Sequence, residues 1–203
     1  WTLSGGDSGA DGLLLFGPDP DWALRIARRQ RAPAVGVQVE LDSAPSVVTD
    51  ERAVGEAAAE HLIGRGLRDL AFFGFAGESW SRQREQGFRS RAALHERARI
   101  HPSLHHSVET WMDDASRRAV RDWLSGLPRP AGILACNDIT AIHLEHECAE
   151  LGLGIPDPIA LLGVNNQSSF CESAPVPLTS VDLDLEQIGY TAAALLDRLM
   201  AGE

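Results

Sequence analysis

The chain has 203 residues and a net charge of −11, with 44% hydrophobic and 23% charged residues. This balance is typical of one large globular domain or two small lobes, and it argues against direct binding of nucleic acid, because an acidic surface repels phosphate backbones. No apolar run approaches the roughly 18 residues of a membrane span, and residues 1–17 contain no basic region followed by an apolar stretch, as a secretory signal would.

Five short apolar runs along the chain predict the strands of a parallel sheet. Each run is apolar on both faces, as in strands that helices cover on both sides. The predicted strands cover residues 11–17, 33–39, 70–75, 131–138 and 159–166.

Helical periodicity fills the segments between these runs. Apolar residues recur there at three- and four-residue spacing. Thr49 can cap the second helix, and Gly66 can end it in the left-handed conformation. The predicted helices cover residues 20–31, 50–65, 81–97, 114–125, 139–151 and 185–200.

The alternation of strands and helices predicts an α/β fold of the doubly wound type. In this fold class ligands bind beyond the carboxyl ends of the parallel strands. Residues 165–184 break the alternation with Pro175 and Pro177, followed by an extended segment. We interpret this stretch as a crossover between two lobes.

Short polar residues and one aromatic residue follow three of the predicted strands. Trp80 lies in the predicted loop after residues 70–75, Asn137 and Asp138 end the next run, and Asn165 ends the last. Amide and carboxylate groups match the vicinal hydroxyls of a polyol, and an indole face suits the C–H face of a sugar ring. Neither GxGxxG nor GxxxxGK[ST] occurs, so the set favours a neutral polyol over a phosphate.

Structural roles are an open alternative for each of these residues. Asp138 directly precedes a predicted helix, so capping of that helix is its favoured interpretation. Ligand contact is favoured over capping for Asn137 and Asn165. Trp80 suits a core or an interface as well as a stacking face for a ligand.

Five segments resemble, in order and spacing, the effector-binding core of the lactose-repressor (LacI/GalR) family. They read VVTDERAVGEAAAEHLIGRGLRDLAFFG, SRQREQGFRSRAA, RPAGILACNDITA, ELGLGIPDPIALLGVNN and PLTSVDLDLEQIGYTAAALLDRLMAGE. The resemblance covers nearly the whole chain. FFGFAGESWSRQREQGF and SVDLDLEQIGYTAAALLDRLM look most like the branch of xylose-operon regulators, which carry an AraC-type helix-turn-helix region after such a core.

The resemblance implies a fold of the periplasmic-binding-protein type I, with two Rossmann-like lobes and a small sugar between them. The N-terminal lobe would comprise residues 1–66 and 184–203, and the C-terminal lobe residues 67–183. Family members carry further elements before residue 11 and a final strand after the last helix, so the resemblance implies an incomplete N-terminal lobe here. It also implies a sugar-sensing transcription regulator that forms a homodimer and contacts DNA only through a domain outside this chain.

The resemblance also implies the ligand contacts. The family's sugar-binding arginine matches Arg84, and the asparagine of its AND motif matches Asn137. The first acid of its GFDD motif matches Asn165, which replaces the usual aspartate and loses charge-assisted hydrogen bonding. Trp80 would supply a stacking face, and Asp50 is a weaker contact for which helix capping is the favoured role. The implied ligand is a monosaccharide, such as xylose, held without a cofactor or a metal ion.

Patterns of catalysis and of metal binding are absent or weak. No GxSxG elbow occurs, and residues 143–148, HLEHEC, lack the HExxH spacing of a zinc site, so we expect an exposed polar helix face there. The histidines at 101, 105 and 106 are expected in an exposed loop for the same reason. We therefore predict that the chain is not an enzyme. An α/β enzyme and a periplasmic sugar-binding protein of a transporter are the alternatives.

The three cysteines, at positions 136, 148 and 171, are far apart and form no CxxC pair. An odd number of separated cysteines is typical of a reducing compartment, so we expect a cytoplasmic protein. Each cysteine is expected to be a small buried side chain.

Overall fold

The computed structural model describes residues 10–17, 25–26, 28–29 and 32–202. These residues form two compact units, of which the first combines the chain up to Thr49 with the chain from Asp184 onward, and the second spans Asp50–Leu183. Among the described residues, no helix combines the length and the apolar character that a membrane crossing requires.

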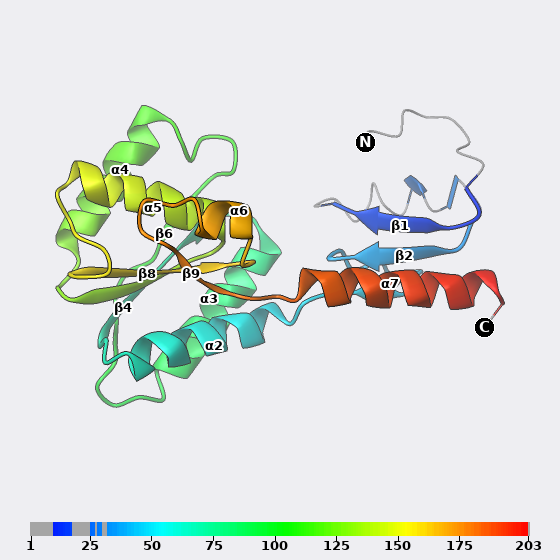
Figure 1. Ribbon diagram of the computed structural model, residues 1–203, viewed down its shortest axis with the longest axis horizontal. Helices are drawn as coiled ribbons and strands as arrows, with labels where there is room; N and C mark the ends of the chain where they lie inside the picture. The colour runs from blue at the N-terminus through cyan, green and yellow to red at the C-terminus, as the bar shows by residue number, and fades with distance from the viewer. Residues whose placement is uncertain (1–9, 18–24, 27, 30–31, 203) are drawn as a thin grey trace. The chain divides into compact units, whose positions relative to one another are not determined.

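The first unit is a parallel sheet of three short strands with a long helix packed on it. The strands follow one another in the order β1 (Leu13–Phe16), β2 (Ala34–Val37) and β3 (Ser46–Val47). Helix α7 (Leu185–Met200) runs along these strands (Figure 1). The helix predicted for residues 20–31 lies largely outside the described residues.

The second unit is built on a six-stranded parallel sheet. Both β5 and β6 pair with β4, at its beginning and at its end respectively, and the order across the sheet is otherwise β5-β4-β7-β8-β9. The strands are β4 (Asp69–Phe75), β5 (Arg99–Ile100), β6 (Leu104–His106), β7 (Ala131–Ala135), β8 (Ile159–Val164) and β9 (Thr179–Val181).

Helices cover both faces of this sheet, which gives three layers (Figure 1). Because neighbouring residues of a strand point to opposite faces, Phe72 and Leu134 pack with α2 (Glu51–Gly64) and α3 (Ser79–Ala92). Phe73 and Ile133 pack on the other face with α4 (Asp114–Gly126) and α5 (Asp138–Glu150). A short helix, α6 (Ser168–Cys171), follows β8. The α/β fold with parallel sheets is as predicted.

Helices α2 and α3 touch through two glycines. A Cβ atom at Gly55 would lie 1.9 Å from the carbonyl oxygen of Arg84, and one at Gly87 would lie 2.0 Å from the carbonyl oxygen of Arg52. This packing places α2 in the second unit, which begins at Asp50. The family resemblance instead implies that residues 50–66 belong to the N-terminal lobe, because the sequence does not reveal what this helix packs against.

Two helix ends differ from the prediction and one agrees with it. Asp50 caps α2 in place of Thr49, since its side chain accepts a hydrogen bond from the backbone N–H of Ala53, which is the role favoured for Asp50 from the sequence. Gly66 follows this helix with the predicted positive φ, +88°. Helix α3 begins at Ser79, two residues earlier than predicted, and therefore includes Trp80.

Candidate functional site

The polar residues singled out from the sequence lie at the carboxyl ends of β4, β7 and β8. After β4 the chain passes through α3 to β5 and β6 on one side of the sheet, whereas after β7 it passes through α5 to β8 on the other. The carboxyl ends of β4 and β7 therefore form a topological switch point, where ligands bind in open α/β sheets. The structure thus brings the residues that follow these two strands together at such a point.

Arg84 is the buried cation of this region. Only 4% of its surface is exposed. Its Nε donates a hydrogen bond to Oε2 of Glu51 at 2.5 Å, and its Nη1 donates one to the carbonyl oxygen of Cys136 at 2.5 Å. Arg84 therefore joins the start of α2 to the end of β7, and its guanidinium is held in a fixed orientation.

Trp80 lies beside Arg84 on the first turn of α3. The Cζ atom of Arg84 lies 5.0 Å from the centre of the indole ring. The ring meets Phe75 edge-on, with the centroids 6.1 Å apart, and its Nε1 donates a hydrogen bond to Glu78 at 2.9 Å. Trp80 is predicted to lie in a loop, and this prediction is wrong because α3 begins at Ser79. The ring packs against its neighbours and is half-buried.

Asn137 is the N-cap of α5, within a reciprocal capping box. Its Oδ1 accepts a hydrogen bond from the backbone N–H of Thr140 at 2.9 Å, and the Thr140 hydroxyl accepts one from the Asn137 backbone at 3.2 Å. Within the described part of the chain, its Nδ2 makes no hydrogen bond. Capping and ligand contact are therefore compatible, since they use different atoms of the amide.

Asp138, predicted to cap α5, is not its cap. The side chain is fully buried, and its two oxygens accept hydrogen bonds from the Ser180 hydroxyl at 2.5 Å and the Gln167 backbone N–H at 2.9 Å. Asp138 thereby ties the end of β7 to the loop after β8 and to β9. The prediction fails because α5 begins at Asp138, one residue earlier than predicted, which makes Asn137 the cap.

Asn165 follows β8 in an uncommon backbone conformation. Its φ is +107°, and the next residue, Asn166, has a φ of +50°. The backbone N–H of Asn165 donates to the Val181 carbonyl at 3.0 Å, and the side chain of Asn166 donates to Asp182 at 3.0 Å. Residues held in such sparsely populated conformations cluster at functional sites. Asn165 is half-buried, and its side chain makes no hydrogen bond to any described residue.

Two residues near these strand ends are not identified from the sequence. Glu51 binds Arg84 from 33 residues away along the chain. Trp111, in the loop after β6, packs edge-on against Phe75 with the centroids 5.7 Å apart, so that Phe75 lies between two tryptophans. Residues 104–106 are predicted as a loop and not as a strand, so the residues that follow them, including Trp111, are not recognised as following a strand.

The polar segment at residues 143–148 is not the exposed helix face that the sequence predicts. His143, Glu147 and Cys148 are buried in α5, and only His146 of the possible ligands is exposed. Burial lowers the pKa of His143 below its usual value. Oε2 of Glu147 accepts a hydrogen bond from Arg121 at 2.5 Å. Among the residues that the structure describes, no group of three side chains could hold a metal ion.

The three histidines near β6 also have structural partners. His101 lies 2.8 Å from Asp69, and His105 lies 2.8 Å from Glu85. His106 ends β6 and is buried, which lowers its pKa. The expectation of an exposed loop is therefore wrong for His106, because residues 104–106 form β6 along β4, whereas His101 lies outside the strands and His105 is exposed.

All three cysteines are buried, as predicted. Burial raises the pKa of Cys136 and of Cys148 to about 11, and it also raises the pKa of Cys171. Each thiol is therefore protonated at neutral pH and unreactive.

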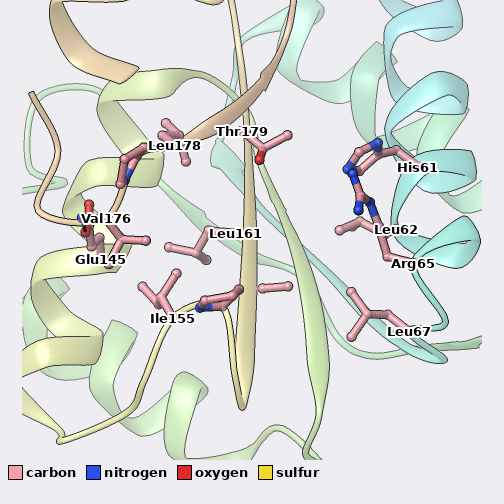
Figure 2. Close-up of a pocket in the computed structure, with 13 residues that line it drawn as sticks. His61, Leu62, Arg65, Leu67, Glu145, Ile155, Leu161, Val176, Leu178 and Thr179 are labelled. Atoms are coloured by element: carbon pink, nitrogen blue, oxygen red, sulfur yellow. Dashed lines mark hydrogen bonds between the residues drawn. The ribbon is translucent and has the colours of Figure 1, made fainter. Parts of the chain in front are cut away.

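A cavity of about 430 Å³ lies apart from these residues, near the amino ends of β4 and β8. Figure 2 shows His61 of α2 and Arg65, which follows α2, on one side of it and Glu145 of α5 on the opposite side, with Leu161 of β8 between them. None of the residues predicted to bind a ligand lines this cavity. A ligand that uses them would bind at the other end of the sheet.

Comparison with known proteins agrees with this architecture. Residues 59–203 match the family model described as a periplasmic binding protein-like domain. The xylose operon regulatory protein of Escherichia coli K12 is 33% identical over 181 residues, which cover 84% of this chain and 46% of that protein. The regulator GntR of Pseudomonas aeruginosa is 33% identical over 202 residues, covering 95% of this chain and 56% of that protein.

A solved structure described as a xylose-binding transcription activator superimposes on the chain with a TM-score of 0.79 and 29% sequence identity, covering 95% of this chain and 53% of that one. The chain spans about half the length of the curated relatives it matches. The strand order, the polar residues at the strand ends and the likeness to these proteins all fit one fold family. The chain belongs to the periplasmic-binding-protein-like domain family, and its relatives are xylose operon regulators and LacI-family regulators.

Proposed function

We propose that the chain is the effector-binding part of a transcription regulator and that its effector is a neutral monosaccharide, a pentose such as xylose. The observation that carries this proposal is the placement of Trp80, Arg84 and Asn137 at the switch point between β4 and β7. The names of the relatives support the same reading, since they are regulators and two of them are named for xylose.

In this proposal the strand-end residues divide the work of holding the sugar. Arg84 offers the guanidinium N–H groups that its two protein acceptors leave over, and Asn137 offers its Nδ2. Asn165 adds a donor and an acceptor for hydroxyl groups. The half-buried ring of Trp80 supplies an apolar face. Asp50 is exposed and caps α2, which leaves it at most a secondary contact.

The remaining properties of the whole protein are proposed from its relatives. Because these relatives are transcription regulators, we expect contact with DNA through another domain, a homodimer, a cytoplasmic location and no catalytic activity. The same names favour a regulator over the sugar-binding protein of a transporter.

Calorimetric titration with a panel of sugars tests the proposal. Xylose, ribose, arabinose and glucose would be titrated into the protein, and glycerol would serve as a polyol that lacks a ring. We expect saturable binding of at least one pentose. Failure of every monosaccharide to bind at millimolar concentration would contradict the proposed function.

A further inference from the structure

We infer that Glu51 sets the charge selectivity of the proposed site, so that the site accepts neutral sugars and rejects sugar acids. The inference rests on the proposed function, because it concerns the ligand that Arg84 binds. It adds a residue and a ligand class to that function.

This ion pair is shielded from solvent on both sides. The side chain of Arg84 is 5% exposed and that of Glu51 is 14% exposed, and their nearest atoms, Nε and Oε2, are 2.5 Å apart. Dissolved salt and water weaken such a buried pair much less than a surface pair. The carboxylate of Glu51 therefore compensates the charge of Arg84 before any ligand arrives.

The helix packing holds Glu51 in this position. Gly55, one turn after Glu51, lies against the backbone of Arg84, and Gly87 lies against the backbone of Arg52. Two helices that touch at both places cannot slide past each other without a clash. The backbone of Glu51 is thus held close to Arg84, within reach of the ion pair.

The remaining donors of Arg84 suit a hydroxyl better than a carboxylate. Its Nε is bound to Glu51, and one N–H of Nη1 is bound to the Cys136 carbonyl. The N–H groups that are left can donate to a sugar hydroxyl. A ligand carboxylate in the same place would meet a compensated cation and would lie close to the negative charge of Glu51, which repels it.

The neighbouring charges reinforce this preference. Asp50 precedes Glu51 in the sequence, Glu78 accepts a hydrogen bond from the indole N–H of Trp80, and the buried Asp138 follows Asn137. Carboxylates therefore adjoin the proposed contact residues, and the guanidinium of Arg84 is already paired with Glu51. A neutral polyol is the ligand class that such a site admits.

Paired titrations of the wild-type protein with D-glucose and D-glucuronate test the inference, because the two sugars share a ring and differ at C6 in having a hydroxymethyl or a carboxylate group. D-xylose serves as the smaller reference. The wild-type protein should bind D-glucose at least about tenfold more tightly than D-glucuronate. Equal or tighter binding of D-glucuronate by the wild-type protein would overturn the inference without help from any variant.

The variant Glu51→Gln keeps the shape of the side chain and removes its charge. It should strengthen the binding of D-glucuronate and thereby lower the ratio of the dissociation constant for D-glucuronate to that for D-glucose by roughly tenfold. Glu56→Gln is the matched control, since Glu56 lies on the same helix and pairs with the exposed Arg52. It should leave the ratio unchanged.

The outcomes separate this inference from the proposed function. If Glu51→Gln weakens the binding of D-xylose and D-glucuronate by the same factor, Glu51 only positions Arg84, and the inference is wrong while the sugar site stands. If the wild-type protein binds no sugar at all, the proposed function fails and the inference fails with it.

Discussion

Gly55 lies directly against the carbonyl oxygen of Arg84, at a distance that leaves no room for a side chain. We predict that Gly55→Ala lowers the free energy of unfolding by about 2 kcal/mol or more, because α2 and α3 must separate to admit the methyl group. Chemical denaturation would measure the change. The separation would also move Glu51 away from Arg84.

Gly64 provides the control for this prediction. It lies in the last turn of the same helix, and a Cβ atom there would meet nothing within 4 Å. Gly64→Ala should therefore leave stability unchanged or raise it by up to about 1 kcal/mol, since alanine favours the helix. Similar losses of stability in both variants would show that helix packing is not the cause.

The sequence predicts the central elements of the second unit well. Strands β4, β7 and β8 are continuous apolar runs between helices, and such runs are recognisable without knowledge of their partners. Strands β5 and β6 have two and three residues, which is too short for any periodicity to be detected. Because β6 is not predicted, Trp111, in the loop that follows β6, is not identified as a candidate residue.

The site could be predicted only in part for a similar reason. Asn137 is identified because it ends a predicted strand, whereas Arg84 is identified only through the family resemblance. Glu51 could not be found in this way, since its contact with Arg84 depends on how closely two helices approach. The close approach of the two helices depends on Gly55 and Gly87. A glycine in a predicted helix does not by itself indicate which residue packs against it.

Asp69 makes the stability of the fold depend on pH in the acidic range. Arg99 donates two hydrogen bonds to its carboxylate, at 2.8 and 2.6 Å, and His101 lies 2.8 Å away. The hydrogen bonds from Arg99 are the first cause of a pKa lowered to about 2. A carboxyl with a lowered pKa stabilises the fold above its unfolded value near 4, and this contribution is lost as the pH falls toward 2.

We therefore predict that Asp69→Asn makes the fold less sensitive to acid. The wild-type protein should lose about 1–2 kcal/mol from this group between pH 4.5 and pH 2, a value kept low because Arg99 is largely exposed. The variant should lose less over the same range. Denaturation curves at several pH values would show this, with Asp122→Asn, an exposed position on α4, as the control. Equal acid sensitivity of all three proteins would contradict the prediction.

Glu147 is a buried anion held by two arginines. Its side chain is fully buried, with Arg121 at 2.5 Å and Arg117 at 3.7 Å. We predict that Glu147→Ala lowers the free energy of unfolding by about 1–3 kcal/mol, because it removes the hydrogen-bond acceptor of Arg121 and the carboxylate beside Arg117, and leaves a cavity. The loss should stay below that of a fully buried pair, since both arginines can still reach water.

Thermal unfolding would measure this loss, with Glu150→Ala as the control on the same helix. Glu150 is exposed, so its replacement should change the stability little. A loss of stability in Glu150→Ala as large as that in Glu147→Ala would show that the helix, and not the buried carboxylate, is sensitive to substitution.

Arg84→Ala tests the proposed sugar contact most directly. The guanidinium is held by Glu51 and by the Cys136 carbonyl, so it is preorganised for a ligand, and its loss should weaken sugar binding by at least about 30-fold. Arg82→Ala, at an exposed position two residues earlier on the same helix, should bind the sugar as the wild-type protein does. Calorimetry gives both affinities, and circular dichroism checks that each variant is folded.

Because Arg84→Ala also leaves Glu51 without its partner, a second variant separates binding from folding. Arg84→Lys retains a positive charge for Glu51 but loses the planar fork that reaches the Cys136 carbonyl at the same time. It should therefore preserve the fold and still weaken the binding of D-xylose, by about tenfold or more. Wild-type affinity in a folded Arg84→Lys or Arg84→Ala variant would exclude Arg84 from the site.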